Sequence, residues 1–510
     1  MQFPSNISDR KIEFKEFFIF IVIPTFLYAG FVTNFTFNFF APYNTWLAYN
    51  EYFLSIINGR LDVPVNAIMR EGQYIDGKAY MYYGLLPILP RIFLHPFVNL
   101  SEVPVSAFSV WFFSVIGVAY LQISILLHFK KYVHTQKFYN TVLLVCVSIL
   151  VWFCSGNFII LQDASLYHEP YAASMCLVNL YVGLLLKNDF KLQSGGQAAL
   201  YALLAGLCVQ ARMPTALSLY AVTSFLILNS SFSYVKDING KVTIVKWCKT
   251  LISNYWLSIL VMFVLGLSIL VLNYMKFDGF FRFTGVPGHY GFFLAGEGYT
   301  ERYCNLVPHT EWSWLFRIIP NSIVFMIGGW GLHDYLMNVF QTGFVRKAPP
   351  LIPFALLWFA PFVIFITVTF LAIRKKLDKS NFILIILLSV SVGGLFQLSY
   401  RTINYRYFTE LWPLLLISIV VLSHHFFKGA FTFNNKKAIL LGFITILTLG
   451  YNVKTSFVKD TQNWVGDPKA KYYEELLKNM NEEKIKQIRQ NFLDGKEEGC
   501  KKLKLSMEEN

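Results

Sequence analysis

Long apolar runs recur along most of this 510-residue sequence, and they constrain its fold more than any other feature. Runs of about 17 to 25 residues are long enough to cross the roughly 30 Å hydrocarbon core of a bilayer as α-helices. Only 15% of the residues are charged, against about 25% in soluble domains. A transmembrane β-barrel would instead show short segments of alternating hydrophobicity. The sequence therefore predicts an all-α polytopic membrane protein.

The positions of Lys and Arg predict the topology. The formal net charge is +14, but the basic residues form short clusters between apolar runs, as the positive-inside rule describes. With the N-terminus inside, five clusters fall on the cytoplasmic side, at 130–137, 187–191, 236–249, 374–376 and 436–437. Because no basic stripe lies on a soluble domain, nucleic-acid binding is not expected. About eleven spans follow, at 17–37, 104–128, 140–160, 169–186, 197–211, 213–229, 254–273, 350–373, 382–399, 411–427 and 438–453.

Two long segments between the predicted spans are expected on the outer face. Residues 39–103 form the first outer loop, with helices near 45–58 and 87–98 that lie on or dip into the interface. Residues 274–348 form the second outer loop, with a half-buried helix at 318–340. In the first loop, the stretch EGQYIDGKAYMYYGLLPILP joins a charged, tyrosine-rich half to an apolar half that contains prolines. We interpret this stretch as a lid and hook at the outer interface.

The end of the apolar pattern predicts the domain organisation. Residues 1–453 are expected to form one transmembrane domain, and residues 454–510 a short polar tail on the outer side with one helix. The spans 197–211 and 213–229 are short and are separated by ARMPT, in which a proline interrupts helical hydrogen bonding. We expect two short helices that meet near the outer surface.

Polar side chains collect in four elements that all open to the predicted outer face. Ionisable groups at span ends usually have a partner or a ligand, because burial without one costs several kcal/mol. The four elements are the first outer loop, LQDASLYHEP, ARMPT and SYRTINYRYFTELWP. They carry Glu51, Asp62, Glu71, Asp76, Lys78, Arg91, Asp163, His168, Glu169, Arg212, Tyr400, Arg401, Tyr405, Arg406 and Glu410.

The polar residues of the first outer loop also have an ordinary structural explanation. Asp76 and Gly77 form a common turn dipeptide, which a solvated turn would explain. Lys78 and Tyr80 are residue types that anchor chains at the headgroup level. A base at Glu71 or Asp76 and a phosphate or sugar contact at Lys78 are the functional alternatives.

The candidates in the other elements have similar alternatives. His168 and Glu169 form a relay or ligand pair, or Glu169 is simply an acidic residue favoured at a helix N-terminus. Arg401 and Arg406 bind one phosphate together, or they are an interfacial arginine pair. Arg212 lies between two apolar helices and needs a partner, either Glu169 or a phosphate.

Five motifs, in this order, resemble the bacterial multi-span proteins grouped with the GT-C glycosyltransferases, which include relatives of protein mannosyltransferases and aminoarabinose transferases. The resemblance extends over roughly residues 15–425 and implies a GT-C-like bundle in a bacterial inner membrane. The motifs are PYNTWLAYNEYFLSIINGRLDVP, DGKAYMYYGLLPILP, YHEPYA, ARMPTAL and NYRYFTELWPLLLI.

The resemblance implies a concrete chemistry. Such enzymes transfer a sugar from a polyprenyl-phosphate carrier to an acceptor at the outer membrane face, usually with inversion and without a nucleotide. A carboxylate in the first outer loop acts as the general base or orients the acceptor hydroxyl. Arg or Lys side chains hold the carrier phosphate, which agrees with the preference of phosphate for guanidinium groups. Donor or substrate contacts are expected from Lys78, Tyr80, His168, Glu169, Arg212, Arg401 and Arg406.

One position departs from the family pattern. Its active members usually carry Asp immediately after the first span, where this sequence has Asn44. An amide cannot accept a proton at neutral pH. The base is therefore expected to be Glu51, Glu71 or Asp76, with Asp163 as the next candidate, or the chain is a non-catalytic member of the fold.

A transporter or flippase for a lipid or a polar solute is the main alternative to an enzyme. Transporters often contain internal repeats and bind near the bilayer midplane, whereas this sequence has no visible repeat and its charges lie at span ends. A divalent metal is not expected, because no H-x-x-x-H motif or cysteine pair is present. His424 and His425, at a cytoplasmic span end, are expected to be solvated or interfacial. The expected partners are membrane lipids, the lipid-linked donor and an acceptor that the sequence does not identify.

Overall fold

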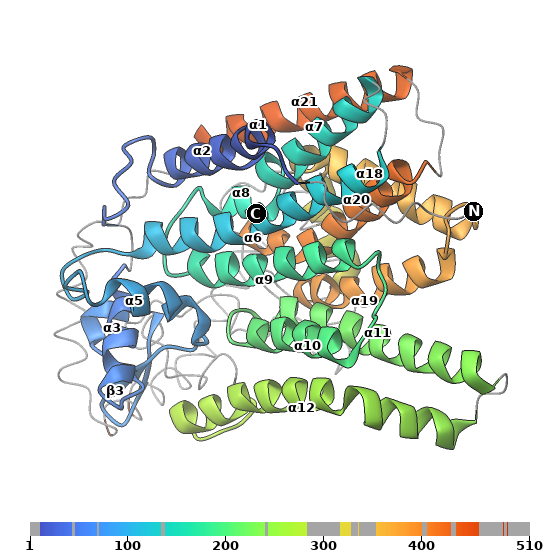
Figure 1. Ribbon diagram of the computed structural model, residues 1–510. Coiled ribbons are helices and arrows are strands. Elements are labelled where there is room, and N and C mark those ends of the chain that lie inside the picture. Colours follow the sequence, from blue (N-terminus) through green and yellow to red (C-terminus); the bar gives the residue numbers. More distant parts are fainter. Residues whose placement is uncertain are drawn as a thin grey trace.

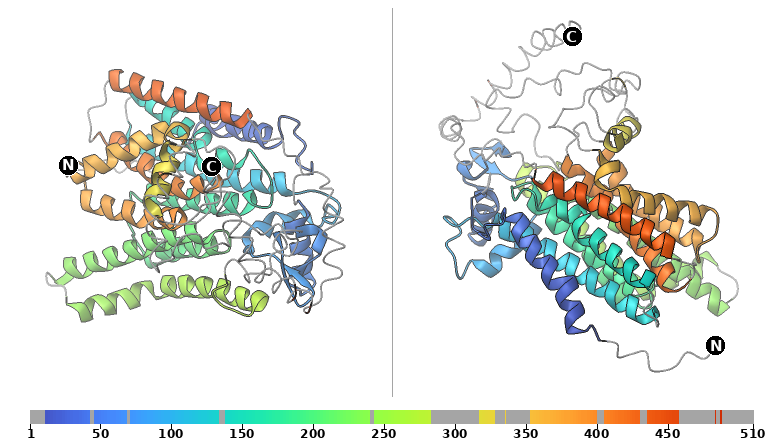
Figure 2. Two further views of the ribbon diagram at one scale, coloured as in Figure 1. Left: turned by 180° about the vertical axis from the view of Figure 1, so that it is seen from behind. Right: turned by 90° about the horizontal axis from the view of Figure 1, so that it is seen from above.

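The computed structural model shows a bundle of long helices with one compact segment at its end (Figure 1). The segment contains the residues between the first two spans, drawn in blue, and both views of Figure 2 show it at the same end of the bundle. The structure describes residues 11–42, 46–68, 71–133, 138–239, 243–282, 317–327, 335, 353–399, 405–429, 435–457, 483 and 487.

Within these ranges, nine helices are long and apolar enough to cross a membrane. This confirms the prediction of a polytopic helical membrane protein. They are Phe14–Val32 (α1, Phe14–Phe17; η1, Phe18–Val22; α2, Ile23–Val32), Ser106–Tyr132 (α6), Phe138–Ile160 (α7, Phe138–Phe153; α8, Gly156–Ile160), His168–Lys187 (α9), Met213–Lys236 (within α11, Met213–Asn239), Ile244–Phe277 (α12), Ser380–Leu398 (α19), Arg406–Phe427 (η4, Tyr405–Leu411; α20, Trp412–Phe427) and Asn435–Ser456 (within α21, Asn435–Phe457).

The other two predicted spans coincide with shorter helices. α10 (Gly195–Val209) and α18 (Phe359–Ile373) have 15 residues each, fewer than the roughly 20 that a perpendicular span requires. Two further short helices are α15 (Ile318–Ile327) and α17 (Phe354–Leu357). The predicted break after α10 is present, but α11 has 27 residues, so the expectation of two short helices is wrong for the second.

Several predicted regions fall wholly or largely outside the described residues. These are most of the second outer loop, including most of the helix expected at 318–340, and the tail after 457 apart from positions 483 and 487. Asn44 and Arg401 also lie outside them.

One end of the bundle is rich in lysine, and we call it the basic end. The Nζ atom of Lys130 lies 2.6 Å from a carboxylate oxygen of Glu16, which joins the end of α6 to the start of the first span. Lys131 forms a 2.7 Å ion pair with Asp189, which directly follows α9. The N-terminal segment and the C-terminal ends of α6 and α9 therefore share the basic end, as the charge pattern predicts.

The opposite end holds residues 46–105, and we call it the loop end. Its helices are α3 (Leu47–Ile57), α4 (Val65–Ile68), η3 (Leu86–Ile88) and α5 (Leu89–Leu94). They surround an antiparallel sheet in the order β1-β3-β2, formed by Asp62–Val63, Lys78–Tyr80 and Gln73–Ile75. This sheet corrects the all-α prediction locally. The expected helices near 45–58 and 87–98 are present as α3 and as η3 with α5.

A two-residue turn connects β2 and β3. Ile75 pairs with Lys78, and the turn residues Asp76 and Gly77 both have positive φ angles, of 51° and 72°. Hairpins of this length favour turns with two positive φ angles, which Asp-Gly adopts readily. The turn explanation for Asp76 therefore agrees with the structure.

Close backbone contact joins α6 to α9 in the centre of the bundle. A Cβ atom on Gly117 would lie 2.6 Å from the Cα atom of Cys176, so the helices approach where a side chain is missing. Small residues serve the same purpose in many membrane helix pairs. These two helices begin at the loop end with Ser106 and His168, and they carry much of the site described next.

Candidate functional site

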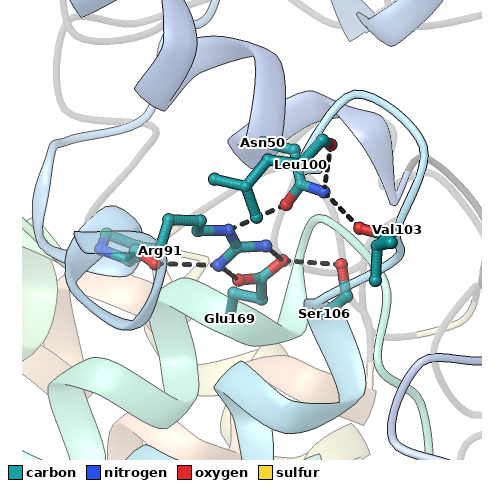
Figure 3. A network of polar contacts seen from close by, with 7 residues as sticks. Asn50, Arg91, Leu100, Val103, Ser106 and Glu169 are labelled. Atoms are coloured by element: carbon teal, nitrogen blue, oxygen red, sulfur yellow. Dashed lines mark hydrogen bonds and ion pairs between the residues drawn. The ribbon is translucent and has the colours of Figure 1, made fainter. Parts of the chain in front are cut away.

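A buried ion pair fastens the loop end to the bundle (Figure 3). Arg91 of α5 and Glu169 in the first turn of α9 are 0% and 1% exposed. Two guanidinium nitrogens of Arg91 donate to the two carboxylate oxygens of Glu169. Ser106 at the start of α6 donates to the same carboxylate over 2.8 Å. The pair therefore connects three elements that are distant in sequence.

Asn50 of α3 completes this network. Its side-chain oxygen accepts a 3.0 Å hydrogen bond from Nε of Arg91. Its side-chain nitrogen donates to the carbonyl oxygens of Leu100 and Val103 over 2.9 and 2.8 Å. The guanidinium also donates to the carbonyl oxygen of Pro87 over 3.0 Å. Burial of both charges is tolerable because each is paired and hydrogen-bonded.

The network corrects one sequence-based expectation. Glu169 was predicted to contact a substrate or to pair with Arg212, but both of its oxygens are occupied by Arg91 and Ser106. Its position in the first turn of α9 agrees with the structural alternative, since acidic side chains are favoured at helix N-termini. In the structure, Glu169 therefore joins α9 to α5 and to the start of α6.

The chain after the hairpin packs against the bundle through its backbone. Lys276, near the end of α12, is buried and donates to the carbonyl oxygens of Met81 and Tyr83 over 2.9 and 3.0 Å. The backbone N–H of Leu86 donates to the carbonyl oxygen of Gln210 over 3.0 Å. At Gly84 a Cβ atom would lie 2.2 Å from that carbonyl oxygen, so glycine is required for this approach.

Gln210 belongs to the break between α10 and α11. The chain of the loop end thus contacts the interruption that the sequence ARMPT produces. The contact explains why the polar and apolar halves of EGQYIDGKAYMYYGLLPILP adjoin: the first half forms the hairpin, and the second lies on the bundle.

Beside this contact lies a group of aromatic and basic side chains, which we call the tyrosine–arginine cluster. The rings of Tyr83 and Tyr167 pack edge to face, with 6.3 Å between their centroids. The guanidinium carbon of Arg406 lies 3.8 Å from the centroid of Tyr167, and that of Arg212 lies 4.1 Å from the centroid of Tyr171. We define the cluster as Tyr83, Tyr167, Tyr171, Arg212 and Arg406.

The cluster is organised by the start of α9. Tyr167 is the N-cap residue of this helix and Tyr171 lies in its first turns, four positions apart and hence neighbours on one face. Arg212 and Arg406, which come from the α10–α11 break and from η4, therefore stack on adjacent turns of the same helix. Each contact of this kind stabilises by roughly 0.5–2 kcal/mol, depending on burial.

Arg212 has a different acidic partner from the one predicted. Its Nε donates to Glu410 over 2.9 Å, and one Nη donates to the hydroxyl of Tyr171 over 2.7 Å. Glu410 is 1% exposed and also accepts a hydrogen bond from Thr215. The requirement for a partner was predicted correctly, whereas the choice of Glu169 was wrong, because that carboxylate lies with Arg91.

His168 lies beside the cluster with a carboxylate next to it. Its Nδ1 atom is 2.9 Å from Oγ of Ser165 and 3.4 Å from a carboxylate oxygen of Asp163. The ring is buried. Asp163 also accepts a 3.0 Å hydrogen bond from the backbone of Ser165. These contacts orient the Nδ1 atom of His168 toward Asp163.

Glu71 approaches the cluster from the loop side. Burial raises the pKa of the Tyr83 hydroxyl, and Tyr82, Tyr167 and Glu71 act in the same direction. The hydroxyls of Tyr82 and Tyr83 lie 2.6 Å apart. Glu71 therefore influences the Tyr83 hydroxyl, and Arg406 stacks on the neighbouring Tyr167.

The other predicted residues lie farther out or have other surroundings. Asp76 and Lys78 are exposed at the hairpin, and Tyr80 is half-buried. Tyr80 packs edge to face with Phe277 at the end of α12, with 6.4 Å between the ring centroids. Glu51 on α3 is partly buried, which raises the pKa of its carboxyl, while Arg60 acts in the opposite direction.

Some site residues were not predicted. The tyrosine platform at Tyr83, Tyr167 and Tyr171 had no signal beyond the general enrichment of tyrosine at membrane interfaces. The Arg91–Glu169 pairing had none either, because Arg91 was given no partner and Glu169 was matched with Arg212 or His168. A cavity of about 110 Å³, lined by residues such as Asp189 and His424, lies at the basic end rather than beside this cluster.

Comparison with protein-family models finds no match, and comparison with curated proteins finds none either. Among solved structures, the chain is similar to the oligosaccharyltransferase of Archaeoglobus fulgidus in its apo form, with 14% identity and a TM-score of 0.42. The same archaeal protein, AglB, in complex with an inhibitory peptide and a dolichol-phosphate gives 14% identity and a TM-score of 0.43. Both alignments cover 91% of this chain and 60% of the archaeal chain, so this chain spans less than two thirds of the length of the proteins it resembles.

Proposed function

We propose that this protein is a membrane glycosyltransferase of the GT-C type, which moves a sugar from a polyprenyl-phosphate carrier to an acceptor at the loop end of the bundle. One observation carries the proposal: Arg212 and Arg406 stack on Tyr171 and Tyr167, on adjacent turns at the start of α9. This end is opposite to the basic end. In a bacterial inner membrane with the basic end inside, the reaction would take place on the outer face.

The cluster suits a lipid-linked phosphate. Guanidinium groups bind phosphate through parallel charge-assisted hydrogen bonds, and the N-terminus of a helix such as α9 favours negative charge. Arg406 stacks on Tyr167, the N-cap residue of α9, and we assign the main phosphate contact to it. Lys78 and Arg401 remain proposed contacts from the loop and from the segment before η4.

The tyrosine hydroxyls suit a sugar. Tyr82 and Tyr83 present two hydroxyls 2.6 Å apart, and each phenol can both donate and accept a hydrogen bond. Tyr80, on the neighbouring strand, extends this surface toward the hairpin. We propose that the sugar lies over these tyrosines with its carrier phosphate near Arg406.

The proposed reaction is a single displacement. The acceptor oxygen forms a bond to the anomeric carbon while the bond from that carbon to the phosphate oxygen breaks, and the acceptor proton moves to a carboxylate. An acceptor hydroxyl requires such a base because its pKa lies far above 7. Glu71 is our first candidate, since it interacts with Tyr83. Asp163 beside His168 is the second, and Glu51 and Asp76 are further alternatives.

Two other functions would use the same residues differently. A transporter or flippase would bind its substrate at an interrupted helix, and the α10–α11 break with its Arg212–Glu410 pair is such an interruption. A non-catalytic relative would keep the lipid-phosphate site and lack the transfer reaction, which the amide at Asn44 would explain.

A transfer assay in native membranes tests the proposal. Membranes that contain the protein are given radiolabelled sugars on polyprenyl phosphate, and the label is followed into lipid, glycan and protein fractions. Glu71→Gln should lower transfer by about a hundredfold or more, whereas Glu102→Gln, at an exposed position of the loop end, serves as the matched control. Protein-dependent movement of the intact lipid across a vesicle membrane, without transfer, would favour the flippase and exclude the enzyme.

A further inference from the structure

Three side chains that commonly bind metals meet at the basic end, far from the tyrosine–arginine cluster. They are His128 near the end of α6, His424 near the end of α20, and Asp189 just after α9. His424 and His128 are 296 positions apart, yet Nδ1 of His424 lies 2.9 Å from Nε2 of His128. One carboxylate oxygen of Asp189 lies 3.7 Å from Nδ1 of His128 and 4.0 Å from Nδ1 of His424.

The three groups lie within reach of one coordination shell, although His128 faces His424 through Nε2 and Asp189 through Nδ1, so one of its two nitrogens would be the ligand. In a tetrahedral site with bonds of about 2.0–2.1 Å to nitrogen and oxygen, neighbouring ligand atoms are roughly 3.3–3.4 Å apart. The three side chains offer one ligand atom each within 4.8 Å of one another. Small rotations of two rings and one carboxylate would place all three atoms around a single ion.

The surroundings hold the three groups in place. His128 and His424 are buried, at 3% and 7% exposure, which excludes the solvated alternative that was expected for His424. Asp189 accepts hydrogen bonds from Lys131 over 2.7 Å and from Tyr132 over 2.9 Å. In known metal sites, hydrogen bonds to the ligating side chains orient them in the same way.

Two of the three groups also line the cavity of about 110 Å³, together with His425, Lys191 and Lys428. A cavity beside the ligands leaves room for a water molecule or a small anion as a further ligand. Sites with three protein ligands and one exchangeable position are typical of zinc and of related divalent metals. The nearby lysines would favour an anion in that position.

We propose that His128, Asp189 and His424 form a binding site for a divalent transition metal of the zinc class. The ion would join the ends of α6, α9 and α20 at the basic end, with its open position toward the cavity. The site is unsuited to calcium and magnesium, because those ions prefer oxygen ligands and two of the three ligands here are imidazoles. The proposal is independent of the glycosyltransferase proposal, since it concerns the opposite end of the bundle.

Metal titration of the full-length protein tests this site. The protein is purified in detergent, its affinity tag is removed, and it is treated with a chelator and then titrated with Co²⁺ and Zn²⁺. We expect one Co²⁺ per chain, with visible absorption that Zn²⁺ abolishes, and a rise in unfolding temperature with Zn²⁺ but not with Mg²⁺. His128→Gln and His424→Gln should each weaken Co²⁺ binding by at least tenfold, since even an outer contact contributes about that much.

His425→Gln is the matched control. This histidine is the neighbour of His424 on α20 and is also buried, but its Nδ1 atom faces the carbonyl oxygen of Val421. Its replacement should leave Co²⁺ binding unchanged. If the wild type binds neither metal, or if His425→Gln and His424→Gln weaken binding equally, the site is excluded. If the wild type does not bind Co²⁺ or Zn²⁺, the site is excluded whether or not the variants fold.

Discussion

Arg91 and Glu169 are 78 positions apart, and they meet as a buried pair in which two guanidinium nitrogens donate to two carboxylate oxygens. Arg91 comes from the loop end, and Glu169 from the first turn of a membrane helix. This pair thus holds the loop end to the bundle. Loss of either partner would leave the other charge buried and uncompensated. The tyrosine–arginine cluster begins two residues before Glu169, at Tyr167.

Removal of one partner should destabilise the protein strongly. Arg91→Ala leaves the Glu169 carboxylate buried without its guanidinium, and a broken buried ion pair costs about 3–5 kcal/mol. Arg91→Met combined with Glu169→Leu should cost less than Arg91→Ala, because no charge stays buried. Thermal unfolding in detergent measures this, with the exposed Lys78→Ala as a control expected within about 0.5 kcal/mol. A double variant less stable than Arg91→Ala would contradict the explanation.

Gly84→Ala should detach the loop from the α10–α11 break. The new methyl group would lie 2.2 Å from the carbonyl oxygen of Gln210, so the backbone must move and the hydrogen bond from Leu86 is lost. We expect faster amide hydrogen exchange over residues 82–88 and a loss of about 1–3 kcal/mol in stability. Gly450→Ala on α21 is the control, because no atom lies within 4 Å of the added group. Equal exchange in both variants would disprove the role of Gly84.

Arg406→Ala should abolish binding of the lipid carrier, and Arg406→Lys should restore only part of it. The planar guanidinium stacks on Tyr167 and offers two parallel hydrogen bonds, each worth about 1.5–3 kcal/mol when charged. An ammonium acts as a point charge and does not reproduce this geometry. Binding of a fluorescent polyprenyl-phosphate analogue measures the effect. Arg374→Ala, which follows α18, should bind like the wild type, and equal binding by Arg406→Ala would remove the proposed role.

The chain beyond α21 should lie on the same side as the first outer loop. Gln162, which precedes α9 at the loop end, donates a 3.0 Å hydrogen bond to Ser456 in the last turn of α21. A reporter fused at position 470 should therefore behave like one inserted near Ser101, and unlike one inserted near Lys376. If the reporter at position 470 is active only in the cytoplasm, the topology and the shared face of the site are both wrong.

The helical framework could be predicted because its signal is local. Each predicted span coincides with a helix, since apolar length and flanking lysines are properties of single segments. The hairpin at Asp76 and Gly77 was also recognisable as a turn from its dipeptide. The sheet was not predicted, because strands of two or three residues, such as Asp62–Val63, are too short to show alternation.

For the candidate site, the sequence indicated two of the five cluster residues, Arg212 and Arg406, and none of the pairings that the structure shows. Arg212 and Arg406 were chosen because charges at span ends need partners, and they do lie in one cluster. Which acid pairs with which arginine depends on how α5, α9 and η4 pack, and no local pattern contains that information. His128, Asp189 and His424 could not be grouped for the same reason, since their spacing along the sequence fits no metal motif.

The loop stretch that we expected to act as a lid is bound on three sides. Lys276 holds its backbone from α12, Gln210 holds it from the helix break, and Arg91 fixes its end to Glu169. Opening it would separate all of these contacts together. We therefore expect a substrate to reach the tyrosine–arginine cluster without any movement of this stretch. A long-chain lipid could do so by diffusing within the plane of the bilayer and entering between helices, with its headgroup already at the depth of Arg406.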